Sequence, residues 1–555
     1  MKIPRVGKRI KSLKRLQQIF SVLLKYGFDD IVNALREDLA IKLGKGLVRK
    51  TTSLRREERV RKVFEELGPT FIKLGQILSL RPDMVPLKIA DELRKLQDEV
   101  PPFSSEEAIK IVEEEIGKEV HEIFSYFSME PMAAASIAQV HRAKTFSGEE
   151  VVVKIKRPNI EKMIALDLDI LFHLAKIAEQ RVAELKLYNP IQILEEVSST
   201  LQKEINFYNE GRNIDRFRRN FEADSSVYIP KVYWELSGER ILTMEFIDGV
   251  KCSDLKKIEE KGLDRKKIAY NGAQLILKQV FDHGFFHADP HPGNLYVLEG
   301  NVIAPLDFGI VGRLSDEMRE ALEDILLAVI KKDVNKILRV FYQMGVISDE
   351  FDSQRLKADT FEFLDRYYKV PLDQLDVPSI INEMFELTRK HKIRFPADFT
   401  LLLKSLATVE GVGRMLNPEF NMIEIALPYG RKIIKKRRSI ERQAKFMSAL
   451  IEDYREMIRN FPSDFVDILR KIKKGEAKVK LEHKNLEKLV SSLERTAKFI
   501  SIALIIAALM ISSSLLVQIK SKILYHFLGM GGFIVAFIFT IFLLFLLLKR
   551  NQKGS

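Results

Sequence analysis

The spacing of hydrophobic residues predicts that the first 130 residues are mostly helical. Over residues 1–50, apolar side chains recur at steps of three and four with lysines and arginines between them, as on an amphipathic helix. Such a helix could lie on an anionic membrane surface, or it could pack its apolar face against the protein itself. At Gly68-Pro69 one helix ends and another begins, because proline suits the first turn of a helix. Further helices are expected at 81–102 and 104–127.

The pattern turns to strands between residues 131 and 158, where two apolar runs flank a turn. The second run is rich in β-branched residues and carries one cation, Lys154. Residues 159–217 have the pattern of two or more helices, and residues 226–249 that of two further strands. Beyond this point the pattern is helical, apart from a hairpin between Asn294 and Asp307. Strands and helices in this order favour the α+β class.

Two apolar runs lie near the end of the chain, at residues 499–519 and 523–548. At the helical rise the first run would span roughly 30 Å, the thickness of a bilayer core. The short link between the runs permits only a tight hairpin, and glycines at 529, 531 and 532 offer small-residue packing against serines 512–514. Cations on both flanks favour a cytoplasmic position for both ends. The alternative is a buried helical hairpin of a soluble domain.

Length, charge and cysteine content narrow the possible classes of protein. The chain has 555 residues, too many for one core, so two or more domains are expected. The net charge of +13 and the pI near 9.3 indicate an anionic partner, such as nucleic acid, a membrane surface or nucleotide phosphates. The single cysteine, Cys252, excludes an intrachain disulfide framework and a multi-cysteine metal site. A reducing interior is the compartment that fits.

The candidate chemistry is concentrated between residues 282 and 312. Asp289 and Asn294 have the DxxxxN spacing of a kinase-type catalytic loop, and a hairpin joins them to the triplet Asp307-Phe308-Gly309. Carboxylate and amide oxygens are the hard ligands that Mg²⁺ takes. We therefore expect Asn294 and Asp307 to hold Mg²⁺, and Asp289 to orient a hydroxyl group or a water molecule.

Two other interpretations of this segment are open. His283, His287, Asp289 and His291 lie close together in the sequence, which also suits a transition-metal site with imidazole and carboxylate ligands. The segment could instead be a turn-rich loop in which Asp and Asn side chains cap nearby backbone. The residues upstream discriminate between these readings.

The upstream strands offer the other parts of a kinase site. Lys154 is costly inside a buried strand unless it is paired, and it matches the phosphate-binding lysine of the kinase V-A-I-K strand. Glu204 and Glu210 lie on a later helix and are both candidates for its partner. An apolar strand that ends at Met244, Glu245 and Phe246 resembles the hinge that offers backbone groups to adenine. The hairpin that carries a glycine-rich loop in kinases here contains Ala133, Ala134, Ala135 and Ser136.

Together these residues make the chain resemble the UbiB family of atypical kinases, from about residue 61 to residue 430. The most specific marks are Lys73-Leu74-Gly75-Gln76, which matches the family's KxGQ motif, the alanine-rich loop, and the HADPHPGN segment around Asp289. From the residues alone, Lys73 and Gln76 would be ordinary helix surface. The resemblance implies instead that the KxGQ helix lies across the nucleotide site, with both side chains facing the phosphates.

The resemblance also implies the roles of other residues and the class of activity. Glu210 would be the partner of Lys154, while Glu204 and Asn206 fall on the family's ExD pair, in which Asn206 departs from the usual aspartate. Members resemble ATPases or small-molecule kinases that use ATP and Mg²⁺ and support isoprenoid-quinone biosynthesis, such as that of ubiquinone, at membranes. We expect ATP, membrane lipids with anionic headgroups, and quinone precursors or their enzymes as partners, and no nucleic acid. The alternative is a catalytically weak nucleotide-binding scaffold for lipid enzymes.

The predicted fold is therefore α+β, a protein kinase-like two-lobed fold with a helical N-terminal extension and a C-terminal two-helix transmembrane hairpin in the cytoplasmic (inner) membrane. The catalytic domain would lie on the cytoplasmic side. The expected parts are a basic amphipathic segment at 1–55, a helical KxGQ extension at 56–128, an N-lobe with inserted helices at 129–248, a C-lobe at 249–430, a charged connector at 431–496 and the hairpin at 497–549.

Overall fold

The computed structural model divides the chain into two compact units, Met1–Gln443 and Ala444–Ser555. It describes residues 4–36, 54–96, 100–181, 189–331, 333–344, 353–368, 376–391, 395–437, 486–518 and 528–541, with the single residues 370 and 455.

The first unit opens with helices, as the pattern predicted. They are α1 (Pro4–Lys25), α2 (Asp29–Arg36), α3 (Arg56–Leu67), α4 (Pro69–Ser79), α5 (Leu87–Leu93), α6 (Ser105–Ile116) and α7 (Val120–Ile123). The break between α3 and α4 falls at Gly68, whose φ of 92° suits a glycine. Ser104 caps α6 by accepting a hydrogen bond from the amide of Glu107 at 3.2 Å.

The apolar face of α1 packs against the protein over the part whose side chains are described. Leu16, Ile19 and Phe20 are buried in a cluster with residues of α3 and of α8 (Ile160–Arg181). Arg15 fixes this contact, because its guanidinium donates to Asp167 at 2.7 and 2.9 Å. This half of α1 therefore packs its apolar face against the protein itself, which was the second of the two alternatives considered for the N-terminal segment.

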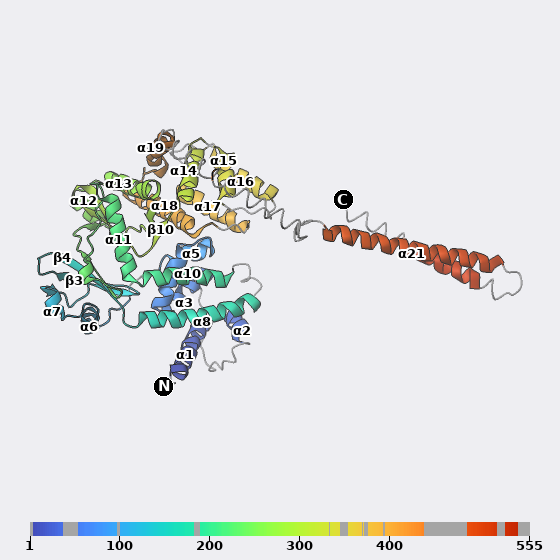
Figure 1. Ribbon diagram of the computed structural model, residues 1–555, viewed down its shortest axis with the longest axis horizontal. Coiled ribbons are helices and arrows are strands. Elements are labelled where there is room, and N and C mark those ends of the chain that lie inside the picture. The colour runs from blue at the N-terminus through green and yellow to red at the C-terminus, as the bar shows by residue number, and fades with distance from the viewer. Residues whose placement is uncertain are drawn as a thin grey trace. The chain divides into compact units, whose positions relative to one another are not determined.

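A five-stranded antiparallel sheet forms the N-lobe (Figure 1). Its strands are β1 (Tyr126–Phe127), β2 (Ala133–Ala134), β3 (Ala138–Lys144), β4 (Glu150–Lys156) and β5 (Ile241–Glu245). The order is β1-β3-β4-β5, and β2 pairs with β3. Along β4, Val151, Val153 and Ile155 pack against α6. Because side chains alternate along a strand, Lys154 points to the opposite face.

One strand prediction was wrong. Of the two strands expected at 226–249, only the second forms, as β5. The first stretch has isolated bridges at Val227 and Val232 and a 3-10 turn, η1 (Trp234–Leu236). Pro230 lies between the two bridges and lacks the amide hydrogen that a continuous ladder needs.

Two helices join β4 to the helix that faces Lys154, so the predicted insertion is present. They are α8 and α10 (Pro190–Glu204), and α11 (Phe207–Phe221) follows them. Asn206 caps α11, since its side-chain oxygen accepts a hydrogen bond from the amide of Tyr208 at 3.0 Å. Asparagine and aspartate serve equally well as N-caps, so the departure at Asn206 leaves the helix start intact.

The C-lobe is mostly helical and contains two small sheets (Figure 1). Its helices are α12 (Leu255–Glu260), α13 (Arg265–Leu277), the π-helix η2 (Lys278–His283), α14 (Asp316–Lys331), α15 (Val334–Gln343), α16 (Ser353–Tyr368), α17 (Val377–Lys390), α18 (Ala397–Leu416) and α19 (Met422–Arg437). Its strands are β6 (Val250–Lys251), β7 (Phe285–His287), β8 (Leu295–Leu298), β9 (Val302–Pro305) and β10 (Val311–Arg313), with the turn η3 (Glu299–Asn301) between β8 and β9. The predicted hairpin is β8–β9, whose register pairs Leu295 with Pro305.

The second unit contains α21 (Leu486–Gln518) and a further helix over residues 528–541. The two helices meet at small residues, as predicted: a methyl group on Gly529 would lie 2.9 Å from the carbonyl oxygen of Ser513, and one on Gly532 would clash with the Ser513 hydroxyl. A methyl group on Gly531 would have no described atom within 4 Å. No helix within the described residues has both the length and the apolarity that crossing a membrane requires. The predicted link and the start of the second apolar run (519–527), the end of that run (542–549) and most of the predicted connector (438–454 and 456–485) lie outside the described residues.

Candidate functional site

Lys154 and Glu210 form the centre of the candidate site. The Nζ atom of Lys154 lies 2.8 and 2.9 Å from the two carboxylate oxygens of Glu210, and the Glu210 side chain is only 2% exposed. Burial by itself would lower the pKa of Lys154, but the carboxylates of Glu210 and Asp307 outweigh it and raise that pKa. The lysine is therefore charged at physiological pH and tied to α11.

A second buried ion pair lies beside the first. Lys73, on the KxGQ helix α4, pairs with Glu204 at the end of α10. A methyl group on Gly309 would lie 3.2 Å from Oδ1 of Asp307 and 3.4 Å from Cγ of Glu204. Glu204 therefore lies next to the Asp307-Phe308-Gly309 triplet. Of the two glutamates that the sequence left open, Glu210 contacts Lys154 and Glu204 contacts Lys73.

Asp307 is the acidic end of this cluster. Burial would raise the pKa of its carboxyl group, but Lys154 and Lys73 outweigh burial and hold that pKa below its usual range. The amide of Gly309 donates to Oδ1 of Asp307 at 3.0 Å, which stabilises the ionised form further. The structure thus brings the strand lysine, the KxGQ lysine and this aspartate into one electrostatic unit.

The catalytic loop (residues 287–294) is held in place by His287. The amide of Asp289 donates to Nδ1 of His287 at 3.1 Å, so Nδ1 accepts, and Nε2 carries the hydrogen that it donates to the Asp307 carbonyl. Burial lowers the pKa of His287, so the ring is neutral. Ser405, on α18, donates to the carbonyl of His287 at 2.9 Å. One neutral imidazole therefore links the loop to the segment that carries Asp307.

Asn294 and Asp307 fit a magnesium ion. The Nδ2 atom of Asn294 donates to the carbonyl of Asp289 at 3.4 Å, which directs the amide nitrogen into the loop and leaves the amide oxygen for a ligand. The amide of Leu306 donates to the carbonyl of Asn294 at 3.0 Å, so the two metal-binding candidates are held side by side across the hairpin. An ionised carboxylate and an amide oxygen are the donors that Mg²⁺ prefers.

The transition-metal alternative does not fit the contacts. His283 lies against the ring of Phe221, with centroids 5.1 Å apart, and His287 is used as described above. The Nδ1 atom of His291 accepts from the amide of Gly293 at 3.2 Å. Among the residues that the structure describes, no group of three His, Cys, Asp or Glu side chains is placed to hold a metal ion.

The alanine-rich loop lies at the edge of the N-lobe sheet, where β2 pairs with β3. Ala133 and Ala134 form β2, and a tight turn follows, in which the amide of Ala135 donates to the carbonyl of Ala138 at 2.7 Å. The hydroxyl group of Ser136 is fully buried and has no hydrogen-bond partner within the described part of the chain. The loop is thus closed by its own backbone.

The hinge residues and Gln76 make contacts within the protein. The amide of Phe246 donates to the carbonyl of Glu150 at 3.0 Å, and that of Glu245 to Lys231, so these two donors are already used. Met244 is buried in the main core. Gln76 donates to the carbonyl of Leu96 at 3.4 Å. The structure brings Lys73, rather than Gln76, to the ion-pair cluster.

Sequence reasoning missed Lys404, on α18. It is 8% exposed, and no described residue forms an ion pair with it. Burial and the nearby Arg94 lower its pKa to about 8, against the opposing effect of Asp91 and Asp289. The neighbouring Ser405 contacts the catalytic loop, so Lys404 is a cation held close to Asp289. The signal was a lone lysine within the apolar run LLLKSL.

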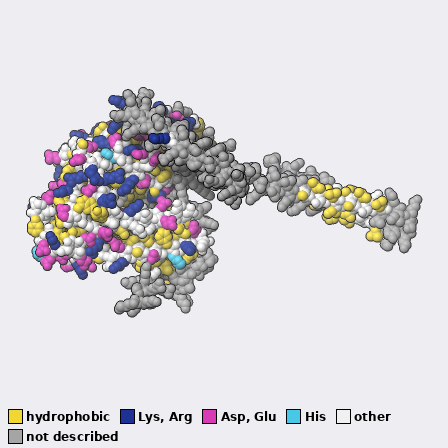
Figure 2. Space-filling model, viewed as in Figure 1, with side chains coloured by type: hydrophobic (Ala, Val, Ile, Leu, Met, Phe, Trp, Pro, Cys, Tyr) yellow, Lys and Arg dark blue, Asp and Glu magenta, His cyan; other side chains and the backbone are white. Residues whose placement is uncertain are grey.

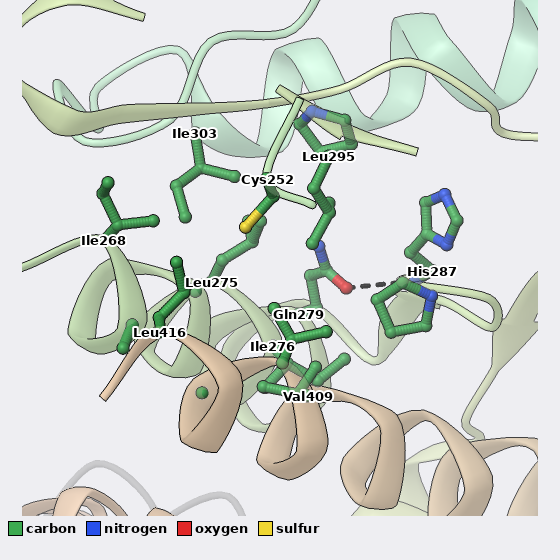
Figure 3. Close-up of a pocket in the computed structure, with 16 residues that line it drawn as sticks. Cys252, Ile268, Leu275, Ile276, Gln279, His287, Leu295, Ile303, Val409 and Leu416 are labelled. Carbon is green, nitrogen blue, oxygen red and sulfur yellow. Dashed lines mark hydrogen bonds between the residues drawn. The ribbon is translucent and has the colours of Figure 1, made fainter. Parts of the chain in front are cut away.

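A small cavity lies beneath the catalytic loop (Figure 3). Its volume is about 30 Å³, enough for water but not for a substrate. Gln279 reaches across it and accepts a hydrogen bond from the amide of His287 at 3.0 Å. Cys252 also faces it, and burial raises the pKa of this thiol to about 12. Gln279 therefore supports the catalytic loop from below, and the cavity is too small to be a second active site.

Three family models match the chain. They are the ABC1 atypical kinase-like domain over residues 95–341, the UbiB helical domain over 360–421 and the ABC1/UbiB kinase-like C-terminal domain over 484–549.

Similar proteins cover most of the chain. An uncharacterized protein in the hydrogenase 1 5′ region of Clostridium pasteurianum is 34% identical, over 97% of this chain and 99% of its own. A probable protein kinase UbiB of Pseudomonas fluorescens strain SBW25 is 35% identical, over 78% of this chain and 83% of its own. A solved structure, the complex of Rv3197 with erythromycin from Mycobacterium tuberculosis, has 21% identity and a TM-score of 0.46, over 72% of this chain and 97% of that one.

Proposed function

Because this chain belongs to the UbiB family of ABC1 atypical kinases, we propose that it binds Mg-ATP between β4 and the β8–β9 hairpin and transfers or hydrolyses the γ-phosphate. The observation that supports this most is the Lys154–Glu210 ion pair at 2.8 Å, with Asp307 acting on the same lysine. A kinase site needs a lysine fixed by a helix glutamate and an aspartate for the metal ion.

Each residue then has a defined task. Lys154 would hold the α- and β-phosphates, and Asn294 and Asp307 would hold Mg²⁺, which neutralises charge on the phosphates when bound. Asp289 would orient the attacking hydroxyl group or water. Lys73 would reach the phosphates once it separates from Glu204.

The acceptor is proposed to be small, or water. Protein kinases place a long activation segment after the Asp-Phe-Gly triplet. Here β10 begins at Val311 and α14 begins at Asp316, so only a few residues separate the triplet from the next helix. That leaves little platform for a peptide substrate. The resemblance to UbiB proteins favours a role in isoprenoid-quinone biosynthesis, such as that of ubiquinone.

We also propose that the second unit anchors the chain in the cytoplasmic membrane. Many of its large apolar side chains are exposed, including Ile500 at 56%, Leu504 at 66% and Phe537 at 66%. Exposed apolar surface on this scale marks a contact with lipid or with another protein. Deletion of residues 499–555 should release the chain from membrane pellets, and retention in the pellet would count against the anchor.

The test of the nucleotide site is thermal stabilisation by Mg-ATP. At 100 times the dissociation constant, a ligand that binds only the folded state adds about 2.7 kcal/mol of stability. Asp307→Asn should abolish this gain, whereas Asp316→Asn, whose side chain is 86% exposed, should keep it. Equal stabilisation of both variants would refute the assignment.

A second assay separates an enzyme from a scaffold. Asp289→Asn should still be stabilised by Mg-ATP but should lose phosphate release. If the unaltered chain binds Mg-ATP without any turnover in the presence of lipid, the scaffold alternative holds instead.

A further inference from the structure

A second cleft, with a volume of about 480 Å³, opens beside the Asp307-Phe308-Gly309 triplet. Its walls are the end of α4, one side of α10 and of α11, the Gly309–Arg313 segment and the start of α18. This volume lies within the range of ligand-binding clefts. The lining residues do not include Lys73, Lys154, Asp289 or Asp307, so the cleft is distinct from the proposed nucleotide site and borders the Asp307-Phe308-Gly309 triplet at Gly309.

Three cations of this cleft form no ion pair with any residue that the structure describes. Lys203, Arg212 and Arg313 line it and are exposed, and none of them forms an ion pair with a described residue. Arg81, by contrast, is held by Asp83 at 2.8 Å and by Glu196 at 2.9 Å. Cations that converge on a concave surface without counter-charges create a positive potential that attracts anions.

The carboxylates of the cleft do not neutralise these three side chains. Glu196 is engaged with Arg81. Asp398 accepts a hydrogen bond from the backbone amide of Arg313 at 3.2 Å, not from its guanidinium group. The neighbouring Arg216 shows the resulting excess of positive charge, because burial and then Arg313 and Arg219 lower its pKa.

The surface view agrees with this picture (Figure 2). Dark-blue side chains gather over α11 on the face shown. Helix α11 carries arginines at four positions, 212, 216, 218 and 219. The charged side chains of such a helix usually face solvent. On α11, however, the side chain of Arg212 lines the cleft.

Part of the cleft wall is apolar. Ile77 comes from α4 and Leu80 caps its end, Ile310 and Val311 come from the segment after Gly309, and Leu401 comes from α18. A site that combines arginine and lysine heads with apolar walls matches a ligand that has both an anionic group and an apolar part. The planar fork of an arginine is well suited to two oxygens of one phosphate group.

We propose that this cleft binds a phosphate-bearing amphiphile, with its phosphate against Lys203, Arg212 and Arg313 and its apolar part against Ile77, Leu80 and Leu401. Of the possible sources of the phosphate we take a lipid, because the apolar wall would have no role in binding a soluble inorganic phosphate, and inorganic diphosphate is the soluble probe that tests this choice.

The test uses the full chain in nonionic detergent, without nucleotide, and isothermal titration calorimetry. The probes are dihexanoyl phosphatidic acid, inorganic diphosphate and, as the uncharged comparison, dihexanoyl phosphatidylcholine. Phosphatidic acid should bind, and Arg212→Gln/Arg313→Gln should weaken its binding about tenfold or more, because the loss of even one charged hydrogen bond has that effect. Circular dichroism checks that this variant is folded, and both side chains are exposed, so folding should be retained.

The control variant is Arg218→Gln/Lys256→Gln. It removes the same charge from exposed positions that do not line the cleft, and it should bind phosphatidic acid as the unaltered chain does. Equal weakening in both variants would show non-specific attraction and overturn the proposal, as would equal binding of phosphatidylcholine. Diphosphate that binds as tightly as phosphatidic acid would overturn the apolar half of the site. Because Asp307→Asn leaves the cleft intact, it should still bind phosphatidic acid even if the nucleotide assignment fails.

Discussion

The buried cation Lys404 should make the protein less stable at neutral pH than at high pH. Its pKa is lowered from 10.5 to about 8 in the folded chain, which means that folding disfavours its charged form. Between pH 8 and 10.5 the unfolded chain binds more protons at this residue, so the free energy of unfolding rises with pH. One pKa unit corresponds to about 1.36 kcal/mol, so the full penalty is about 3 kcal/mol. It is present below pH 8 and gone by pH 10.5.

Lys404→Met removes this charge at nearly constant length. The variant should be up to about 3 kcal/mol more stable at pH 7, and its advantage should shrink as the pH rises from 8 towards 10.5. The measurement is urea denaturation of the full chain in detergent at pH 7, 8, 9 and 10, with the difference between variant and unaltered chain taken at each pH. That difference cancels the many other groups that titrate in both proteins.

Lys256→Met is the matched control, because Lys256 is exposed on α12. It should change stability little and equally at every pH. A Lys404→Met variant that is less stable at pH 7, or whose advantage does not depend on pH, would refute the reasoning. Since the charge lies close to Asp289, the stabilised variant should also turn over ATP more slowly, which is the usual cost of removing a strained functional group.

Two further predictions concern the KxGQ helix. Gly75→Ala should destabilise the chain by about 1–3 kcal/mol, because its methyl group would lie 2.8 Å from the ring of Phe64 and closer still to Leu96; urea midpoints measure this. Gly411→Ala, a helical glycine with open space around it, should instead be neutral or stabilising, and a similar loss in both would contradict the packing argument. Lys73→Ala should cost about 3–5 kcal/mol, because it leaves the carboxylate of Glu204 buried without its cation. A double-mutant cycle with Glu204→Gln checks this, and additive losses would contradict a direct pair.

Local patterns in the sequence were enough to place most elements of the lobes. The Gly68-Pro69 break, the helices inserted after β4 and the β8–β9 hairpin were all predicted, because each depends on residues close together in the chain. The prediction of a strand just before β5 was wrong. The apolar pattern there is that of a strand, but Pro230 interrupts the hydrogen-bond ladder that a strand requires.

The pairings within the site were harder to predict. Lys154 could be singled out because a lysine inside a buried strand needs a partner, but spacing alone left Glu204 and Glu210 equal. Glu204 pairs with Lys73 because α4 packs against α10, a contact between segments that the local sequence pattern does not reveal. Lys404 and Arg212 lie on helices where a cation usually points to solvent. Their positions beside a loop and in a cleft arise from contacts between segments far apart in the chain.

Helix α11 connects both halves of the site through one face. Glu210 holds Lys154, and Asn213, one turn later, donates to the carbonyl of Phe308 at 3.0 Å. Phe217, a further turn along, packs against Phe308 with ring centroids 5.0 Å apart. A kinase site needs both the lysine–glutamate pair and the metal-binding aspartate in place. Here a sliding or rotating helix would unseat the lysine and the phenylalanine at the same moment. An inhibitor that wedges α11 outward should therefore switch the whole centre off in one step, with no half-assembled form for it to trap.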